Sequence, residues 1–155
     1  MTAETLVNQV NTAKQYFDKS TDCLEEGDSD FCPSEGMFTA AQQVAHTAQT
    51  VDWFMEGAFG SGFDMDFAKH VGEVRKVSSL KAARESLDRS FAKLTDLIGS
   101  KSMEELSEPI PEGPVMAGLP RMTIVSGLVE HTSHHRGALT VYSRLRGKVP
   151  AMPYM

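Results

Sequence analysis

Apolar residues recur every three to four positions over four long segments of this sequence, and almost no segment alternates in the way that a β-strand requires. The segments run from about Thr2 to Leu24, from about Thr39 to Gly57, from about Ser79 to Gly99, and from near Pro120 to Gly147. Each segment is long enough to bury one apolar face against the others. We therefore expect an all-α fold built from four long helices.

The stretches between these segments carry residues that stop a helix. The acidic run 25–30 ends the first helix, with Gly27 expected just after its last turn. Ser78 or Ser79 can cap the third helix, and Gly99 can end it. The prolines between residues 109 and 120 forbid a continuous helix there, and Pro120 is expected at the first position of the fourth helix.

Residues 58–77 are rich in glycine and phenylalanine and lack a clear periodic pattern. We expect a long loop without structure of its own, which is typical of a lid or rim over a site. The alternative is a surface loop whose phenylalanines tuck against the bundle. His70 lies in this loop and is expected to be exposed.

The composition favours a single globular domain over residues 1–155. A net charge of −6 argues against a nucleic-acid partner, which needs a basic surface. No apolar run approaches the roughly 18–20 residues of a membrane span, and no signal peptide is visible, so we expect no membrane partner and a cytoplasmic location. Cys23 and Cys32 are expected to be reduced thiols, with a disulfide between them as the alternative.

His131 and His135 lie four residues apart on the stripe of the last helix that is expected to face the core. Two imidazoles at this spacing share one helix face and can converge on one cation. His46 of the second helix can supply a third nitrogen if the two helices pack together, and three protein ligands with an open position are typical of a catalytic metal site. The alternative is a pair of core histidines, each satisfied by one hydrogen bond.

The second helix carries an unusual polar stripe around its histidine. This stripe is either a solvated face or the wall of a polar, ligand-lined cavity. Its members are Gln42, Gln43, His46, Gln49, Thr50 and Trp53.

Other catalytic motifs are missing from the sequence. Thr132 stands where the HExxH motif of zinc proteases carries its glutamate, and His134 points about 100° away from His135 on an ideal helix. The sequence contains no phosphate-binding loop, no dinucleotide fingerprint and no serine-nucleophile elbow. Asp52 and Glu130 are expected to be solvated surface acids.

The histidine pattern resembles that of the DinB/YfiT-like family of bacterial proteins. The residues that carry the resemblance are His46 in Gln-Gln-Val-Ala-His, the final-helix run His131-Thr-Ser-His-His135-Arg-Gly, and the ending Tyr142-Ser-Arg-Leu-Arg-Gly-Lys-Val-Pro150. The resemblance implies an up-down-down-up four-helix bundle with a long crossover. It also implies one divalent metal ion, such as zinc, nickel or iron, held by His46, His131 and His135.

The same resemblance sets the expectations for function. It implies a metal-dependent enzyme with a thiol-dependent S-transferase-like or hydrolase-like activity on a small molecule, with a low-molecular-weight thiol as one candidate cosubstrate. It also implies a homodimer. The alternative is a non-catalytic metal-binding or small-molecule-binding stress protein, and a purely structural bundle is the third hypothesis. No residue of this sequence specifies the substrate.

Overall fold

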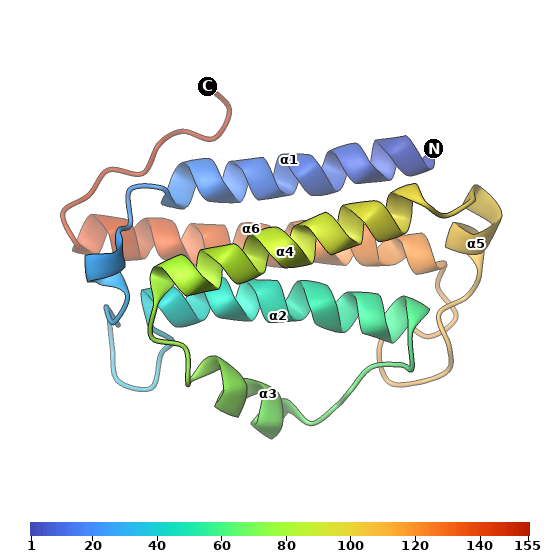
Figure 1. Ribbon diagram of the computed structural model, residues 1–155, viewed down its shortest axis with the longest axis horizontal. Helices are drawn as coiled ribbons and strands as arrows, with labels where there is room; N and C mark the ends of the chain where they lie inside the picture. The colour runs from blue at the N-terminus through green and yellow to red at the C-terminus, as the bar shows by residue number, and fades with distance from the viewer.

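The computed structural model describes residues 1–155, and its four long helices confirm the expected all-α, up-down-down-up bundle (Figure 1). The helices are α1 (Ala3–Thr21), α2 (Ala40–Phe59), α4 (Leu80–Gly99) and α6 (Ile124–Leu145). In Figure 1, α1 and α6 run in one direction while α2 and α4 run in the other. None of the helices is both long and apolar enough to cross a lipid bilayer.

The four helices enclose one core. α1 packs against α4 and α6, and α2 packs against the same two helices from the opposite side. The apolar stripes predicted from the sequence meet between them, and burying each large side chain contributes about 1.5–3 kcal/mol before the entropy of ordering is counted. The largest fully buried apolar side chains include Phe17, Leu80, Leu87, Leu94, Ile98, Ile124, Leu128 and Leu139.

Helix caps explain two of the boundaries. The Ser79 side chain accepts a hydrogen bond from the Ala82 backbone N–H, and α4 runs to Gly99, as predicted. Thr39 caps α2 by accepting a hydrogen bond from Gln42, whose own side chain bonds back to the Thr39 N–H. These reciprocal bonds satisfy backbone donors that the first turn leaves free.

The prediction of an unstructured loop over residues 58–77 is wrong. This segment contains the helix α3 (Phe67–Val74), which Asp66 caps by accepting a hydrogen bond from the Lys69 N–H. Because α2 and α4 run in parallel, their connection has to travel back along the bundle, and α3 lies beside α2 on the way (Figure 1). Only two helical turns form there, which is too short for periodicity to reveal.

Side chains of α2 hold this connection in place. The indole N–H of Trp53 donates to the Asp64 carbonyl at 2.8 Å, and the Gln49 amide donates to the His70 carbonyl at 3.1 Å. His70 is half-buried rather than exposed, because its Nε2 also lies 3.2 Å from the Asp64 carbonyl. The segment is therefore fastened to the polar stripe of α2.

Two further boundaries differ from the sequence prediction, and one short helix was not predicted. α1 ends at Thr21, and Gly27 lies inside the short 3₁₀ helix η1 (Glu26–Asp28) instead of closing α1. α6 begins at Ile124, because the residues after Pro120 form the 3₁₀ helix η2 (Arg121–Thr123). A short helix, α5 (Met103–Ser107), precedes the proline-rich stretch, which contains no helix, as predicted.

The C-terminal tail packs against α1. The C-terminal tail folds back towards α1 (Figure 1), where the Tyr154 ring meets the Tyr16 ring edge-on at a centroid distance of 5.1 Å. Cys23 and Cys32 are both free thiols, as expected.

A buried carboxylate joins the end of α6 to the α1–α2 connection. Asp28 is 2% exposed and accepts hydrogen bonds from Arg146 Nε at 2.9 Å, Lys148 Nζ at 2.5 Å and the Glu25 N–H at 2.9 Å. We call Asp28, Arg146 and Lys148 the Asp28 cluster. Burial alone would raise the pKa of Asp28, but the hydrogen bonds from Lys148, Glu25 and Arg146 outweigh it and lower the pKa to about 2.

Candidate metal centre

Three histidines meet between α2 and α6. One ring nitrogen from each of His46, His131 and His135 lies within 4.8 Å of the others. The Nε2 atoms of His131 and His135 are 3.1 Å apart, and the His46 ring centroid lies 5.2 Å and 4.9 Å from theirs. We call these three residues the histidine cluster. The structure thus brings together the three side chains that the sequence singled out.

Helix geometry accounts for this meeting. His131 and His135 lie one turn apart on the face of α6 that packs against α2, and His46 lies on the facing polar stripe of α2. Two other members of that stripe, Gln43 and Thr50, are each only 8% exposed. The stripe is therefore the polar wall of a buried contact and not a solvated face.

The ring nitrogen of His135 that lies away from the cluster, Nδ1, is hydrogen-bonded within the protein. Its Nδ1 lies 2.5 Å from Oε1 of Gln43. The Gln43 amide nitrogen donates to the Tyr142 hydroxyl at 3.2 Å, and that hydroxyl donates to the Phe38 carbonyl at 2.8 Å. This chain of bonds leaves Nε2 of His135 facing the other two histidines.

His131 is less well paired. The Thr50 hydroxyl lies 3.4 Å from its Nε2, while its Nδ1 is buried without a hydrogen-bond partner. The hydroxyl of the next residue, Thr132, is also buried and unpaired. An unsatisfied buried polar group costs about 1–3 kcal/mol and is uncommon in native proteins. This part of α6 is therefore not optimised for core packing alone.

The environment keeps the three imidazoles neutral. Burial lowers the pKa of His135 to about 3 and that of His131 to about 4, and the neighbouring histidines add to both shifts. Burial also lowers the pKa of His46, although a hydrogen bond with Gln49 opposes this effect. Neutral imidazoles offer free lone pairs, which is the form that metal ions require.

The residues present fit a divalent transition-metal ion. Two histidine nitrogens bound tetrahedrally to one zinc ion, each at about 2.0–2.1 Å, are about 3.3 Å apart. The 3.1 Å between the two Nε2 atoms is close to that value. Three nitrogens form the group, and no carboxylate or thiolate joins them. Such a donor set leaves a coordination position for a water molecule or a substrate.

The neighbouring candidates lie outside the cluster. His134 and Glu130 are exposed, as expected from their places on α6. Asp52 is also exposed and accepts a hydrogen bond from the Ser90 hydroxyl at 3.0 Å. These three residues therefore supply no ligand from where they lie.

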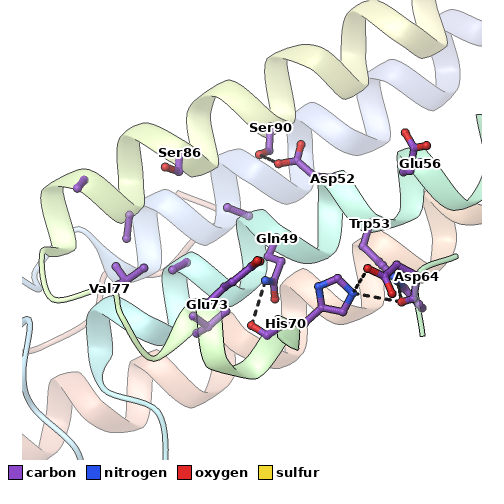
Figure 2. Close-up of a pocket in the computed structure, with 15 residues that line it drawn as sticks. Gln49, Asp52, Trp53, Glu56, Asp64, His70, Glu73, Val77, Ser86 and Ser90 are labelled. Atoms are coloured by element: carbon purple, nitrogen blue, oxygen red, sulfur yellow. Dashed lines mark hydrogen bonds and ion pairs between the residues drawn. The ribbon is translucent and has the colours of Figure 1, made fainter. Parts of the chain in front are cut away.

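A groove of about 550 Å³ lies between α2, α3 and α4 (Figure 2), and no histidine of the cluster lines it. Figure 2 shows Asp52 held by Ser90 on one side and the His70 ring directed towards Asp64 on the other. Gln49, which lines the groove, lies one turn after His46. Four carboxylates and no lysine or arginine line the groove, so it disfavours polyanions.

Sequence reasoning missed the part that Tyr142 plays. It placed this residue on the inward stripe as a core side chain, and the ring is indeed 1% exposed, but its hydroxyl orients Gln43. Gln43 was recognised only as a member of the polar stripe. The available signal was the three-residue spacing of Gln43 and His46, which puts a side-chain amide next to a candidate ligand on one helix face.

Comparisons with known proteins identify the family and the fold. Residues 9–139 match the DinB superfamily, and no curated protein matches the chain in sequence. A DinB-like protein from Bacillus cereus ATCC 10987 has a TM-score of 0.77 and 19% sequence identity, over 97% of each chain. An uncharacterised protein from Clostridium difficile 630 has a TM-score of 0.74 and 16% identity, over 94% of this chain and 97% of that one.

One similar structure carries a functional description. YfiT from Bacillus subtilis is described as a probable metal-dependent hydrolase with an unusual four-helix bundle topology. It has a TM-score of 0.70 and 14% identity, over 94% of this chain and 88% of its own. At identities this low, the three structures establish a shared fold.

Proposed function

Since the chain belongs to the DinB superfamily, we propose that it is a metal-dependent enzyme that acts on a small molecule. His46, His131 and His135 are its metal ligands, and zinc, nickel or iron(II) is its ion. The single observation that carries this proposal is the convergence of three neutral histidine nitrogens within 4.8 Å. Imidazole ligands accept several first-row ions, so the geometry of the site and the availability of each ion in the cell decide which one is used.

When bound, a divalent ion at this position lowers the pKa of a water or thiol ligand and polarises a substrate carbonyl. The chain's own residues prepare the place for this chemistry. Burial keeps the imidazoles neutral, and the Gln43 amide holds the His135 ring. The Thr50 hydroxyl, 3.4 Å from Nε2 of His131, can bond a polar group that arrives at the cluster.

Two reaction classes follow from this arrangement. Hydrolysis is supported by the description of YfiT as a probable metal-dependent hydrolase. Transfer of a low-molecular-weight thiol to an electrophile is favoured by the donor set. The group of three histidines includes no carboxylate that could serve as a general base for water. A thiol, with a pKa near 8.5, loses its proton more easily than water and needs a base less.

The substrate is a small neutral or cationic molecule in the cytoplasm. The groove between α2, α3 and α4 has a volume within the usual range of small-molecule sites, roughly 300–1,000 Å³. We propose that it receives the organic part of the substrate, since Gln49 connects it to His46. Its carboxylates argue against nucleic acid, which agrees with the net charge of −6.

We also propose that two copies of the chain associate. Val141 and Leu145 are 54% and 60% exposed and lie one turn apart, so they give the end of α6 an apolar surface. Light scattering at micromolar concentration is expected to give about twice the 17.0 kDa mass of one chain. A mass near that of one chain would contradict the dimer without affecting the metal site.

The decisive experiment measures metal content and turnover together. Protein purified without added chelator is analysed for bound metal, then loaded with zinc, nickel or iron(II). It is assayed with activated esters, and separately with small thiols plus monochlorobimane. We expect turnover in one assay, and the loss of both turnover and bound metal in His135→Ala. His70→Ala, which removes a histidine outside the cluster, should keep its metal. Metal binding with background rates in both assays would leave a non-catalytic binding protein as the function.

A further inference from the structure

We propose that Gln43 is a positioning residue of the histidine cluster: it fixes the tautomer of His135, so that Nε2 presents its lone pair to the metal ion. The inference rests on the proposed metal site and adds to it a residue that binds no metal. Its basis is the hydrogen-bond chain that runs from Phe38 through Tyr142 and Gln43 to His135.

The direction of each hydrogen bond follows from the Phe38 end of the series, where the roles of donor and acceptor are fixed. The Phe38 carbonyl can only accept, so the Tyr142 hydroxyl donates to it. The Tyr142 oxygen then accepts from the Gln43 NH₂ group at 3.2 Å, which turns the amide oxygen towards His135. An amide oxygen can only accept, so Nδ1 of His135 carries the proton. Its Nε2 is therefore unprotonated.

Burial makes this arrangement hard to replace. Gln43, Tyr142 and His135 are 8%, 1% and 7% exposed, so water has little access to take over either bond. A flipped amide would aim its NH₂ group at Nδ1 and its oxygen at the Tyr142 hydroxyl. That hydroxyl already donates its one proton to the Phe38 carbonyl, so two oxygen atoms would face each other without a proton between them. The network therefore has one consistent state.

His131 provides the internal contrast. Its Nδ1 has no partner, and its Nε2 lies 3.1 Å from Nε2 of His135 and 3.4 Å from the Thr50 hydroxyl. A hydroxyl can donate or accept, so the contact with His135 sets the tautomer. Because Nε2 of His135 is an acceptor, Nε2 of His131 carries the proton in metal-free protein. The two histidines of one helix turn are thus expected to hold opposite tautomers until a metal ion binds.

The first test reads the tautomers directly. Long-range ¹H–¹⁵N NMR spectra of metal-free protein labelled at histidine distinguish a protonated Nδ1 from a protonated Nε2. We expect Nδ1–H for His135 and Nε2–H for His131, and Nδ1–H for both after zinc is added. In Gln43→Met, which keeps the volume but removes the acceptor, His135 should lose its preference. A wild-type His135 protonated on Nε2 would overturn the inference.

The second test measures zinc affinity by competition with a chelator. Loss of a partner of a ligating histidine typically weakens metal binding roughly 10–100-fold, and we expect this for Gln43→Met. Gln43→Glu, which restores an acceptor, should return the affinity to near that of the wild type. Gln42→Met is the matched control, because Gln42 is an equally buried glutamine whose amide donates to the Arg75 carbonyl instead. It should bind zinc as the wild type does.

Three outcomes separate this inference from the proposed metal site. Wild-type affinity in Gln43→Met, or an equal loss in Gln42→Met, would overturn the positioning role while the metal site stands. A wild-type protein that binds no divalent ion would overturn both. If Gln43→Met fails to fold, Tyr142→Phe replaces it, since that variant frees the amide to flip and should weaken zinc binding by a smaller factor.

Discussion

The Asp28 cluster and the histidine cluster are both buried polar contacts between α6 and an earlier part of the chain, yet their hydrogen bonding differs. Asp28 accepts three hydrogen bonds, two of them from cations, and its charge is matched. The histidine cluster places two Nε2 atoms 3.1 Å apart and leaves Nδ1 of His131 without a partner. A contact that the protein completes by itself serves stability, whereas one that it leaves incomplete has capacity for a ligand.

The largest expected difference between the two clusters is in how acid changes their contributions to the unfolding free energy. The folded pKa values of His131 and His135 lie below their unfolded value of 6.5, so the unfolded chain takes up protons first as the pH falls. The contribution of these two histidines to the unfolding free energy is therefore fully present above pH 6.5 and is lost as the pH falls towards 4 and below. We expect the metal-free protein to lose about 3 kcal/mol of unfolding free energy between pH 7 and pH 5, measured by urea denaturation.

Variants assign that loss to one cluster. His135→Gln should remove about half of the pH dependence. Asp28→Asn should keep all of it, because the pKa of Asp28 falls from 3.8 to about 2 on folding and that carboxylate loses its contribution only below about pH 4. An equal change of slope in both variants would mean that the two clusters are coupled.

Metal should stabilise one cluster alone. At zinc concentrations 100-fold above the dissociation constant, binding adds about 2.7 kcal/mol, which corresponds to a rise of roughly 5–10 °C in melting temperature. His131→Ala should abolish this increment, while Asp28→Asn and His70→Ala should retain it. Thermal unfolding with and without zinc measures the increment, and an unchanged response in His131→Ala would show that the ion binds elsewhere.

Removing the charge of Asp28 should cost slightly less. The lowered pKa implies that the hydrogen bonds from Lys148, the Glu25 N–H and Arg146 favour the charged carboxylate by about 2 kcal/mol at neutral pH, and Asp28→Asn should lose that amount. Glu25→Gln is the control, because Glu25 also contacts Lys148 but its side chain is 80% exposed, and its loss should cost below about 0.5 kcal/mol. Similar costs in urea denaturation would remove the distinction between the buried and the exposed partner.

The smallest expected effect concerns two buried threonines. Thr132 has an unpaired hydroxyl beside the histidine cluster, whereas the Thr47 hydroxyl donates to the Gln43 carbonyl at 2.9 Å. Thr132→Val should be neutral or stabilise by up to about 1 kcal/mol, and Thr47→Val should destabilise by about 1 kcal/mol. A marked loss in Thr132→Val would reveal a partner for its hydroxyl.

The sequence predicted the long helices well because their signals are local. Apolar periodicity and the Ser79 cap depend on neighbours within a few residues, and both are confirmed. α3 was missed because eight residues hold too few repeats to show a period, and Gly72 lies within them. The α1 boundary was misplaced because Gly27 is a good helix terminator in general, while the Asp28 bonds close a 3₁₀ turn at that point.

The three histidines of the cluster could be predicted from the sequence, but the residues around them could not. His131 and His135 are indicated by their spacing within one helix, and His46 by its place on a second predicted helix. The family resemblance added the implication that the three bind one metal ion. The pairing of Gln43 with His135 depends on how α2 and α6 pack, and Asp28 is buried in a run of acids that reads as solvated. Contacts between distant segments carry no local signal, so they emerged only from the folded chain.

The packing of α2 against α6, the last helix of the chain, has a consequence for how the protein is made. Gln43 and His135 are 92 positions apart, so α6 is synthesised long after α2. At about 5–20 residues per second, α2 waits roughly 5–20 seconds for α6. During that interval His46 lacks His131 and His135 as neighbours, and the histidine cluster cannot form. The proposed metal ion could therefore be bound only by a chain whose synthesis is nearly finished.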